Sequence, residues 1–203
     1  MNIIYVASKN DHKVSEFQRL LGPLKMEIRP LPSDVPEAPE DGLTFLENAR
    51  QKAVFYSRHV GGLVLADDSG LTIPALNGEP GVYSARYAGV HGDDERNNKK
   101  LLERMSGLTG SLRAGDFVCA LVLYCHSNGF ELTSEGRLSG IIAEEPCGSN
   151  GFGYDPLFYL PEFRKTVAEL SMAEKNQVSH RSNAVKQLIR LWEARSDADL
   201  RSR

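Results

Sequence analysis

The sequence lacks long hydrophobic runs and has few cysteines. No stretch of its 203 residues approaches the roughly 20 apolar residues of a transmembrane helix, and the start, MNIIYVASKN, has too short an apolar run for a signal peptide. The three cysteines are odd in number and lack paired zinc-ligand spacing, which is typical of reduced thiols. These absences predict a cytoplasmic protein with no membrane span.

Neither sign of charge dominates. Twenty-four Lys and Arg against 27 Asp and Glu give a formal net charge of -3, and no long basic run exists beyond the pair Lys99 and Lys100. Non-specific binding to nucleic acid is therefore not expected. No glycine-rich loop ends in Gly-Lys-Ser/Thr, which excludes a Walker-type nucleotide site.

What is present is enough apolar material for one sizeable core. Hydrophobic residues make up 41% of the chain, and no repeat, low-complexity tract or long linker divides it. The length favours one domain, although it leaves room for two small lobes. We therefore expect a single domain over residues 1–195 and a polar tail, residues 196–203, that cannot pack.

Hydrophobic patterning predicts a mixture of strands and helices. Strands are expected at residues 2–8, 26–31, 63–66, 116–125, 130–143 and 155–159. Helices are expected from Asn10 or Asp11 to Gly22, from Thr44 to about Val60, at about 96–105, and from about His180 to Ala194. Capping boxes pair Thr44 with Glu47 and Ser171 with Glu174.

One strand is expected to be central. The stretch DFVCALVLYC, residues 116–125, is apolar on both parities, so both of its faces should be covered. Strand-helix units alternate with hairpins along the chain. The sequence therefore predicts an α/β (mixed α+β) fold around a mixed β-sheet with flanking helices.

Polar residues gather where the first strand meets its helix. In ASKNDHK, residues 7–13, Ser8, Asn10 and Lys13 lie at a junction where backbone N–H groups and the positive end of the helix dipole favour an anion. A polar cap with a solvated lysine is the alternative interpretation.

Two adjacent carboxylates follow the third strand in VLADDSGL, residues 64–71. Alternation places Val64, Ala66 and Asp68 on one face and Leu65 and Asp67 on the other. Both acids are ionised at neutral pH, so water or a cation must stabilise them, and Mg²⁺ commonly links one or two carboxylates to phosphates. Alternatively, the pair starts a polar turn before Gly70.

Two later stretches could contact a nucleotide. GSNGFGYDPLFY, residues 148–159, combines glycines with Phe152 and Tyr154, whose rings could stack on a base, or it forms only an aromatic-lined turn. Its glycine order does not fit a Rossmann fingerprint. Lys175 and the pair His180 and Arg181 lie before and at the start of the last helix, where they could bind an anion or be solvated.

Six stretches in order resemble the Ham1/inosine triphosphate pyrophosphatase family. They are SKNDHK, GLTFLENARQKA, LADDSGL, GEPGVYSARYAG, GFGYDPLF and EKNQVSHR, within a resemblance that runs from about Ile3 to Trp192. The resemblance implies a hydrolase that converts noncanonical purine triphosphates (ITP, dITP, XTP) to the monophosphate and pyrophosphate. It also implies a Mg²⁺ cofactor and a homodimer of elongated, two-lobed protomers, each with a central cleft.

The resemblance also implies roles for individual residues. Asp68 is similar to the metal-linked general base, and Glu40 to a second metal ligand. The substrate contacts that it implies are Ser8, Asn10, Lys13 and Lys52 for the phosphates, Ser69 directly after the general base, and Phe152, Gly153, Tyr154, Asp155, Lys175, His180 and Arg181 for the purine. Aiming donors at the 6-keto oxygen would reject adenine.

The sequence departs from the family pattern in two places. Lys9 and His12 stand where glycines are frequent in the first loop, and Glu37 and Asp41 flank Glu40 closely enough to take its place as ligand. Two alternative functions stay open. A Maf-like pyrophosphatase would act on other triphosphates, and a regulatory module would bind a nucleotide without hydrolysing it.

Overall fold

The chain divides into two compact units. The structure, a computed structural model, describes residues 3–8 and 11–201, the side chains of residues 11, 12 and 196–201 excepted. The first unit contains residues 1–68, 119–136 and 181–203, and the second contains residues 69–118 and 137–180. The residue ranges of the two units meet within strands β3, β4 and β5 and at the start of helix α5.

The first unit is an α/β arrangement with parallel pairing. Strand β1 pairs in parallel with β2 and with β3, so that Ile4 lies opposite both Ile28 and Leu63. The elements that contribute to this unit are β1 (Ile3–Val6), α1 (Asp11–Leu20), β2 (Glu27–Pro30), α2 (Phe45–Val60), β3 (Leu63–Thr72), β4 (Ala114–Cys125), β5 (Phe130–Ile142) and α5 (His180–Arg201).

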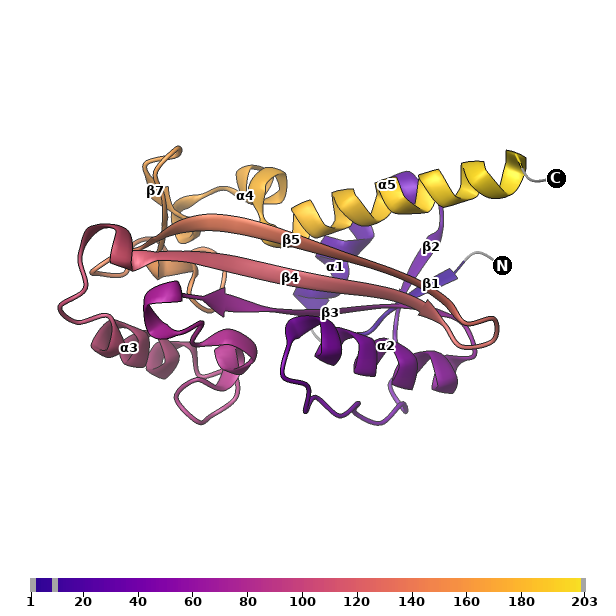
Figure 1. The fold of residues 1–203 in the computed structure, drawn as a ribbon, viewed down its shortest axis with the longest axis horizontal. Coiled ribbons are helices and arrows are strands. Elements are labelled where there is room, and N and C mark those ends of the chain that lie inside the picture. The colour runs from indigo at the N-terminus through magenta and orange to yellow at the C-terminus, as the bar shows by residue number, and fades with distance from the viewer. Residues whose placement is uncertain (1–2, 9–10, 202–203) are drawn as a thin grey trace. The chain divides into compact units, whose positions relative to one another are not determined.

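Helices cover both faces of the strands in this unit. On one face, Phe17 of α1 and Leu188 of α5 pack with Leu65 and Leu121 in one core cluster. On the other face, α2 packs in a second cluster that includes Val64 and Ala66. Figure 1 shows α1 and α5 on one side of β3 and α2 on the other. Residues of opposite parity on β3 therefore face different helices.

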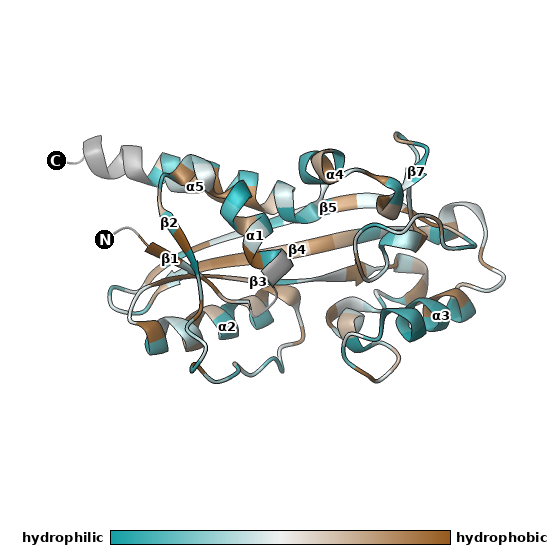
Figure 2. Cartoon of the chain, turned by 180° about the vertical axis from the view of Figure 1, so that it is seen from behind, coloured by the Kyte–Doolittle hydropathy of each residue, from teal (hydrophilic) through white to brown (hydrophobic). Residues whose placement is uncertain are grey.

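The second unit has its own core. Its elements are the remaining parts of β3, β4 and β5 together with α3 (Asp94–Arg104), β6 (Phe158–Leu160), β7 (Lys165–Thr166) and α4 (Met172–Val178). Strand β6 pairs antiparallel with β5 and with β7. The core is a cluster of buried side chains that includes Leu71, Leu101 and Phe158. Figure 2 shows hydrophobic residues along β4 and mostly hydrophilic ones on α3.

The sheet order confirms the expected fold class. Within the described residues, seven strands follow the order β2-β1-β3-β4-β5-β6-β7, with parallel pairs near one end and antiparallel pairs near the other. Strand β4 is the fourth of the seven, as its apolar faces predict. The elongated, two-lobed outline and the division into residues 1–195 and 196–203 stay predictions.

Local signals placed several helix ends correctly. Helix α2 begins after Thr44, whose hydroxyl accepts a hydrogen bond from the Glu47 N–H, and it ends before Gly61, whose φ of 65° is the left-handed conformation that favours glycine. The Ser171 box likewise starts α4. None of the described helices is both long enough and apolar enough to cross a membrane.

Three expected boundaries were wrong. Strand β3 continues to Thr72 instead of ending at Ala66, because Leu71 is fully buried and sheet pairing overrides the polar local sequence. Residues 155–157 form a 3-10 turn around Pro156, so β6 begins only at Phe158. Helix α5 continues to Arg201 instead of ending at about Ala194, since residues 195–201 contain neither glycine nor proline.

Candidate active site

The two adjacent aspartates lie within β3 and face opposite sides of it. The alternation expected from the sequence is confirmed, since Leu65 packs with α1 and α5 while Val64 and Ala66 pack with α2. Asp67 accordingly meets side chains from α1 and α5, and Asp68 meets side chains from α2. The alternative of a polar turn beginning at this pair is wrong, because the strand continues past both.

Asp67 is a buried carboxylate between two cations. Its side chain is 2% exposed, and its Oδ2 lies 3.0 Å from the Nζ of Lys13 and 3.9 Å from the Nε of Arg181. Burial alone would raise the pKa of Asp67, but Lys13, Arg181 and Lys52 lower it well below its ordinary value. Asp67 is therefore ionised at neutral pH and fixes both cations in place.

Arg181 is almost completely buried. Besides facing Asp67, it donates from one terminal nitrogen to Oε2 of Glu16 on α1 at 2.7 Å, and only 1% of the residue is exposed. A buried arginine is stable only where carboxylates partner it. The first residue of α5 that belongs to the first unit is thus tied to α1 and to β3.

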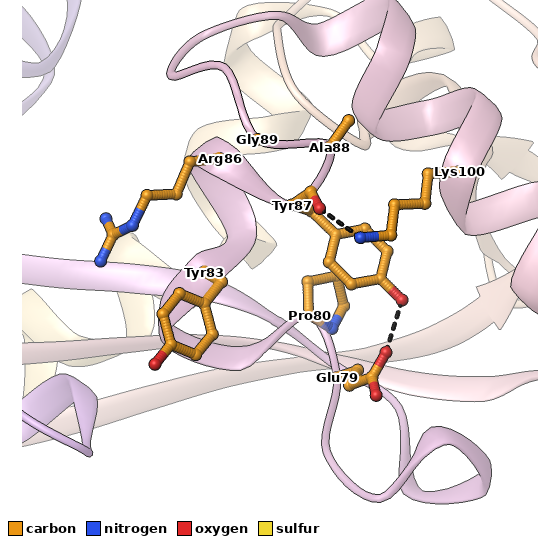
Figure 3. Close-up of a pocket in the computed structure, with 8 residues that line it drawn as sticks. All are labelled: Glu79, Pro80, Tyr83, Arg86, Tyr87, Ala88, Gly89 and Lys100. Carbon is orange, nitrogen blue, oxygen red and sulfur yellow. Dashed lines mark hydrogen bonds between the residues drawn. The ribbon is translucent and has the colours of Figure 1, made fainter.

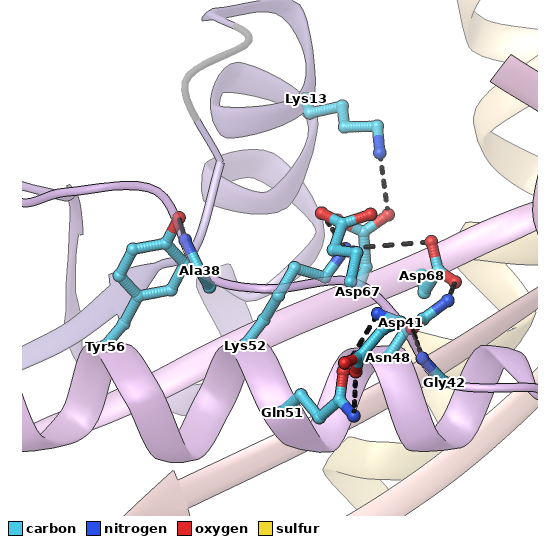
Figure 4. Close-up of polar contacts among 11 residues, drawn as sticks. Lys13, Ala38, Asp41, Gly42, Asn48, Gln51, Lys52, Tyr56, Asp67 and Asp68 are labelled. Atoms are coloured by element: carbon cyan, nitrogen blue, oxygen red, sulfur yellow. Dashed lines mark hydrogen bonds and ion pairs between the residues drawn. The ribbon is translucent and has the colours of Figure 1, made fainter. Parts of the chain in front are cut away.

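Asp68 is held by two side chains of α2. Its Oδ2 accepts a hydrogen bond of 3.0 Å from the Asn48 side-chain amide, and its Oδ1 lies 3.7 Å from the Nζ of Lys52 (Figure 4). Burial raises the pKa of Asp68, and Asp67 and Glu40 add to that rise, while Lys52 and Asn48 oppose it. A raised pKa makes this carboxylate a better proton acceptor once it is ionised.

The orientation of the Asn48 amide is fixed by the loop before α2. The Gly42 N–H donates to Oδ1 of Asn48 at 2.8 Å, so the amide nitrogen must be the end that faces Asp68. A Cβ on Gly42 would lie 2.8 Å from that same oxygen, so glycine is what allows the backbone to approach so closely.

Lys52 connects Asp68 to the acidic loop. Its Nζ lies 3.3 Å from Oε1 of Glu40 and 3.7 Å from Oδ1 of Asp68. Burial alone would lower the pKa of Lys52, but Asp67, Asp68 and Glu40 raise it above its usual value, so the group is a cation. Asn48 and Lys52 are four positions apart on α2, which places both on the face toward β3.

Glu40 and its acidic neighbour Asp41 are placed differently. Asp41 accepts a hydrogen bond of 2.8 Å from the Gln51 amide, whereas Glu40 faces Lys52 (Figure 4 shows the pair Asp41 and Gln51). Asp41 is therefore engaged at the start of α2, and Glu40 is the acid of the two that lies beside the Asp68 cluster.

Another predicted phosphate contact, Ser8, lies just after β1. Ser8 is the second residue after this strand, and its N–H donates to the Val6 carbonyl oxygen at 2.8 Å. Asn10 lies outside the described residues. Helix α1 begins at Asp11, and Lys13 in its first turn reaches Asp67, as described above.

A second group of predicted contacts lies in the second unit. Lys175 on α4 pairs with Oδ2 of Asp155, which also accepts a hydrogen bond of 3.1 Å from the Phe152 N–H. The Lys175 Nζ lies 5.1 Å from the centre of the Phe152 ring, and Phe152 is 49% exposed. An exposed ring beside a lysine could stack on a base while the cation bonds to its oxygens.

The remaining predicted contacts in this unit are less exposed. Tyr154 is buried in the core and its hydroxyl donates to the Ser84 carbonyl oxygen at 2.8 Å, which leaves Phe152 as the exposed ring of the pair. His180 is 8% exposed and stacks on Phe117 with ring centres 5.0 Å apart. Ser69 is the first residue of the second unit and lies within β3.

The structure thus gathers the predicted residues into two groups. Those in the first unit are Ser8, Lys13, Glu40, Lys52, Asp68 and Arg181, and those in the second are Ser69, Phe152, Gly153, Tyr154, Asp155, Lys175 and His180. Sequence reasoning missed Glu16 and Asn48, and it gave Asp67 no role. The spacing of Asn48 four residues before Lys52 was the available signal.

The depression near GEPGVYSARYAG, residues 78–89, is separate from these side chains. Figure 3 shows it in the second unit, between the loop of Glu79 and the side chain of Lys100. Glu79 accepts hydrogen bonds from the Tyr87 hydroxyl at 2.7 Å and from Arg104 at 3.2 Å, and Lys100 donates to the Tyr87 carbonyl at 2.6 Å. These groups form hydrogen bonds with one another, which is typical of residues with a structural role.

The first unit brings cations and carboxylates together beside β3. Lys13, Lys52 and Arg181 supply positive charge, and Asp68 and Glu40 supply oxygen ligands. Among the residues that the structure describes, no group of three or more His, Cys, Asp or Glu side chains is arranged to hold a metal. Any metal here would need further ligands from water or from a phosphate.

Comparisons with known proteins find relatives over most of the chain. The model of the Ham1 family matches residues 4–191. The chain is 46% identical over 192 residues to a dITP/XTP pyrophosphatase of Listeria innocua, covering 93% of each chain, and 47% identical over 193 residues to one of Acinetobacter baumannii, covering 92% and 93%. It is similar to the structure of a HAM1 protein from Coxiella burnetii, with a TM-score of 0.88, 43% identity, and coverage of 96% and 100%.

Proposed function

Because this chain belongs to the Ham1 family, we propose that it hydrolyses noncanonical purine nucleoside triphosphates (XTP, dITP and ITP) to the monophosphate and pyrophosphate. The names of its relatives, dITP/XTP pyrophosphatases, support this substrate class. The single observation that carries the proposal is the partly buried cluster in which Asp68 meets Lys52 and Asn48.

Lys13 and Lys52 are the proposed phosphate-binding cations. Both are already held beside carboxylates, at 3.0 Å from Asp67 and at 3.3 Å from Glu40, so their positions are fixed before substrate arrives. Cations held in place stabilise charge on transferring phosphoryl groups without reorganising. Arg181 would act indirectly, by keeping Asp67 ionised and in place.

The donor set of the site suits Mg²⁺. Glu40 and Asp68 both approach the Lys52 ammonium, so the site presents two carboxylate oxygens to a single positive charge. Mg²⁺ typically takes one or two carboxylates and completes its shell with waters and substrate phosphates. Glu40 and Asp68 would hold the ion, which when bound would neutralise charge on the phosphate oxygens.

Asp68 is the proposed general base. Its carboxylate would accept a proton from water as the water oxygen attacks the α-phosphorus, and the bond from that phosphorus to the bridging oxygen of the pyrophosphate would break. The Asn48 amide occupies one lone pair of Oδ2 and can only donate there, so it orients the carboxylate without competing for the proton.

The group of predicted residues in the second unit is the proposed binding site for the purine base. The exposed Phe152 ring would stack on the purine, and Lys175 would donate to the 6-keto oxygen. Adenine would oppose this donor with an amino group, a mismatch that can reach about 10⁴-fold in discrimination. His180 and Ser69 are further proposed contacts in the same unit.

The homodimer and the cytoplasmic location are parts of the same proposal. Cys119, Cys125 and Cys147 are free thiols, which supports a reducing compartment. Sedimentation of the purified protein would test the dimer.

A panel of triphosphates tests the proposal. Pyrophosphate release should be fast with ITP, dITP and XTP, slow with ATP and with pyrimidine triphosphates, and abolished by EDTA. Preference for pyrimidine substrates would favour the Maf-like alternative. Binding of ITP without release would favour the regulatory module.

A further inference from the structure

Gly153 lies at the centre of the proposed base-binding segment, and both of its backbone polar groups are bonded to side chains of α3. Its N–H donates to Oδ2 of Asp94 at 2.6 Å, and its carbonyl oxygen accepts from the Asn98 amide at 2.9 Å. Asp94 and Asn98 are four positions apart, so they lie on the same face of the helix. The peptide groups on either side of Gly153 are thus held at two points.

Helix α3 is itself anchored, so it can serve as a fixed support. Asn97 accepts a hydrogen bond of 2.7 Å from the Ala88 N–H and donates to the Ala85 carbonyl oxygen at 3.3 Å. Leu101 of the same helix is fully buried in the core of the second unit. The two contacts to Gly153 therefore tie an exposed loop to a packed helix.

The conformation at Gly153 explains why such support is needed. Its φ of 63° is left-handed, and a glycine gives up more conformational freedom on ordering than any other residue. Phe152, immediately before it, keeps an exposed ring, and Lys175 lies over that ring. Backbone rotation at Gly153 would therefore change the orientation of the Phe152 ring.

We propose that Asp94 and Asn98 are positioning residues for the purine base, acting through Gly153 on the Phe152 ring. This inference rests on the proposed function and adds two residues to its specificity site. Neither side chain touches the substrate in this proposal. Their effect is to hold the ring in the orientation that stacks on the base, so that binding does not have to order the loop.

An ordinary role at the helix terminus does not explain the contact of Asp94. An acidic side chain in the first turn of α3 is favourable to the helix dipole, and Glu95 offers the same charge one residue later. The N-cap is Asp93, whose carboxylate accepts from the Arg96 N–H at 3.1 Å. What distinguishes Asp94 from these two acids is its bond to Gly153.

Steady-state kinetics with ITP test the inference. Asp94→Ala and Asn98→Ala should each raise KM about tenfold, as expected for losing a hydrogen bond to an ordered loop, and leave kcat within about twofold. Asp94→Asn keeps an oxygen that can accept from Gly153 and should restore most of the affinity. Asn98→Asp keeps the volume but places a carboxylate against the Gly153 carbonyl, so it should be at least as impaired as Asn98→Ala.

The matched control is Glu95→Ala, which removes an acid from the same helical turn and should behave like the wild type. Amide hydrogen exchange gives a readout that does not depend on activity. Exchange in a peptide covering residues 150–156 should accelerate in Asp94→Ala and Asn98→Asp but not in Glu95→Ala. Melting temperatures of all variants separate this local effect from unfolding of the protein.

Two results would overturn the inference. The first is that the wild type hydrolyses ITP and that Asn98→Asp and Asp94→Ala have the same KM for ITP as the wild type. The other is an equal loss in Asp94→Ala, Asp94→Asn and Glu95→Ala, which would reduce Asp94 to a helix-dipole charge. Failure of the proposed function is distinguishable from both, because the wild type itself would then release no pyrophosphate from any triphosphate.

Discussion

Replacing Asp67 by Asn removes the carboxylate that faces both Lys13 and Arg181 and changes little else. Asn has nearly the same shape as Asp, so no cavity forms, and the perturbation is electrostatic. In the native protein the Asp67 Oδ2 lies 3.0 Å from the Lys13 Nζ and 3.9 Å from the Arg181 Nε. The side chains of Asp67 and Arg181 are each 2% exposed, and that of Lys13 is 24% exposed.

The size of the effect follows from these exposures. Breaking a buried ion pair by removing one partner costs roughly 3–5 kcal/mol, because the remaining charge is left in a poorly solvating environment. Arg181 keeps Glu16 at 2.7 Å, and Lys13 can reach water, so the lower end applies. We expect a loss of about 3 kcal/mol in the free energy of unfolding, which for a chain of this size is roughly 6–12 °C in Tm.

The loss should depend on pH in a definite direction. The pKa of Asp67 is lowered by folding, so its stabilising contribution is complete above the unfolded value of about 3.9 and declines as the pH falls below it. Asn does not titrate. The difference in stability between wild type and Asp67→Asn should therefore be full at pH 7 and narrow below about pH 4.

Urea unfolding of the two proteins at a series of pH values, with EDTA present throughout, measures this difference. A double-mutant cycle with Lys13→Met isolates the pair, since Lys13→Met should cost less in the Asn background than in the wild type. A loss under about 1 kcal/mol at pH 7, or a difference that stays constant down to pH 3, would refute the reasoning from burial and charge.

Two further substitutions test other parts of the structure. Asn48→Ala should lower kcat for ITP about tenfold or more with little change in KM, because Asp68 loses its orienting donor. The control is Gln51→Ala, which removes only the side-chain donor of Asp41. An equal loss of kcat in Gln51→Ala would contradict the prediction. Arg113→Met should lower the free energy of unfolding by roughly 3 kcal/mol in urea titrations, since the buried guanidinium donates to four carbonyl oxygens. An unchanged urea midpoint of unfolding would contradict this prediction.

Helix boundaries were predictable where the signal is local. The capping boxes at Thr44 and Ser171 satisfy backbone groups within three residues, so the sequence alone specifies where α2 and α4 begin. The central position of β4 was predictable for a related reason, because a strand that is apolar on both parities has to be covered on both faces.

The path of β3 was not predictable in this way. A segment reading DDSGLT resembles a turn, yet it is strand, because pairing within the sheet and the cations around Asp67 and Asp68 compensate its polar residues. Those cations come from distant positions. Arg181 is 114 residues after Asp67, and nothing local indicates that the two approach each other.

The candidate site was partly accessible from sequence. Alternation along a strand was enough to predict that the two aspartates face different partners, and that prediction is confirmed. Which side chains those partners are depended on packing of α1, α2 and α5. Glu16 was missed because its buried contact is with Arg181, 165 positions later, whereas Asn48 could have been found from its helical spacing with Lys52.

The most direct measurement compares pyrophosphate release from ITP by the wild type and by Asp68→Asn, with Mg²⁺ present and with the fold of each checked by its melting curve. A carboxylate that accepts the proton from water cannot be replaced by an amide, so release should fall by at least about 10²-fold while the fold is retained. Release within a few-fold of the wild type, from a folded Asp68→Asn protein, would contradict the assignment of Asp68 as the base.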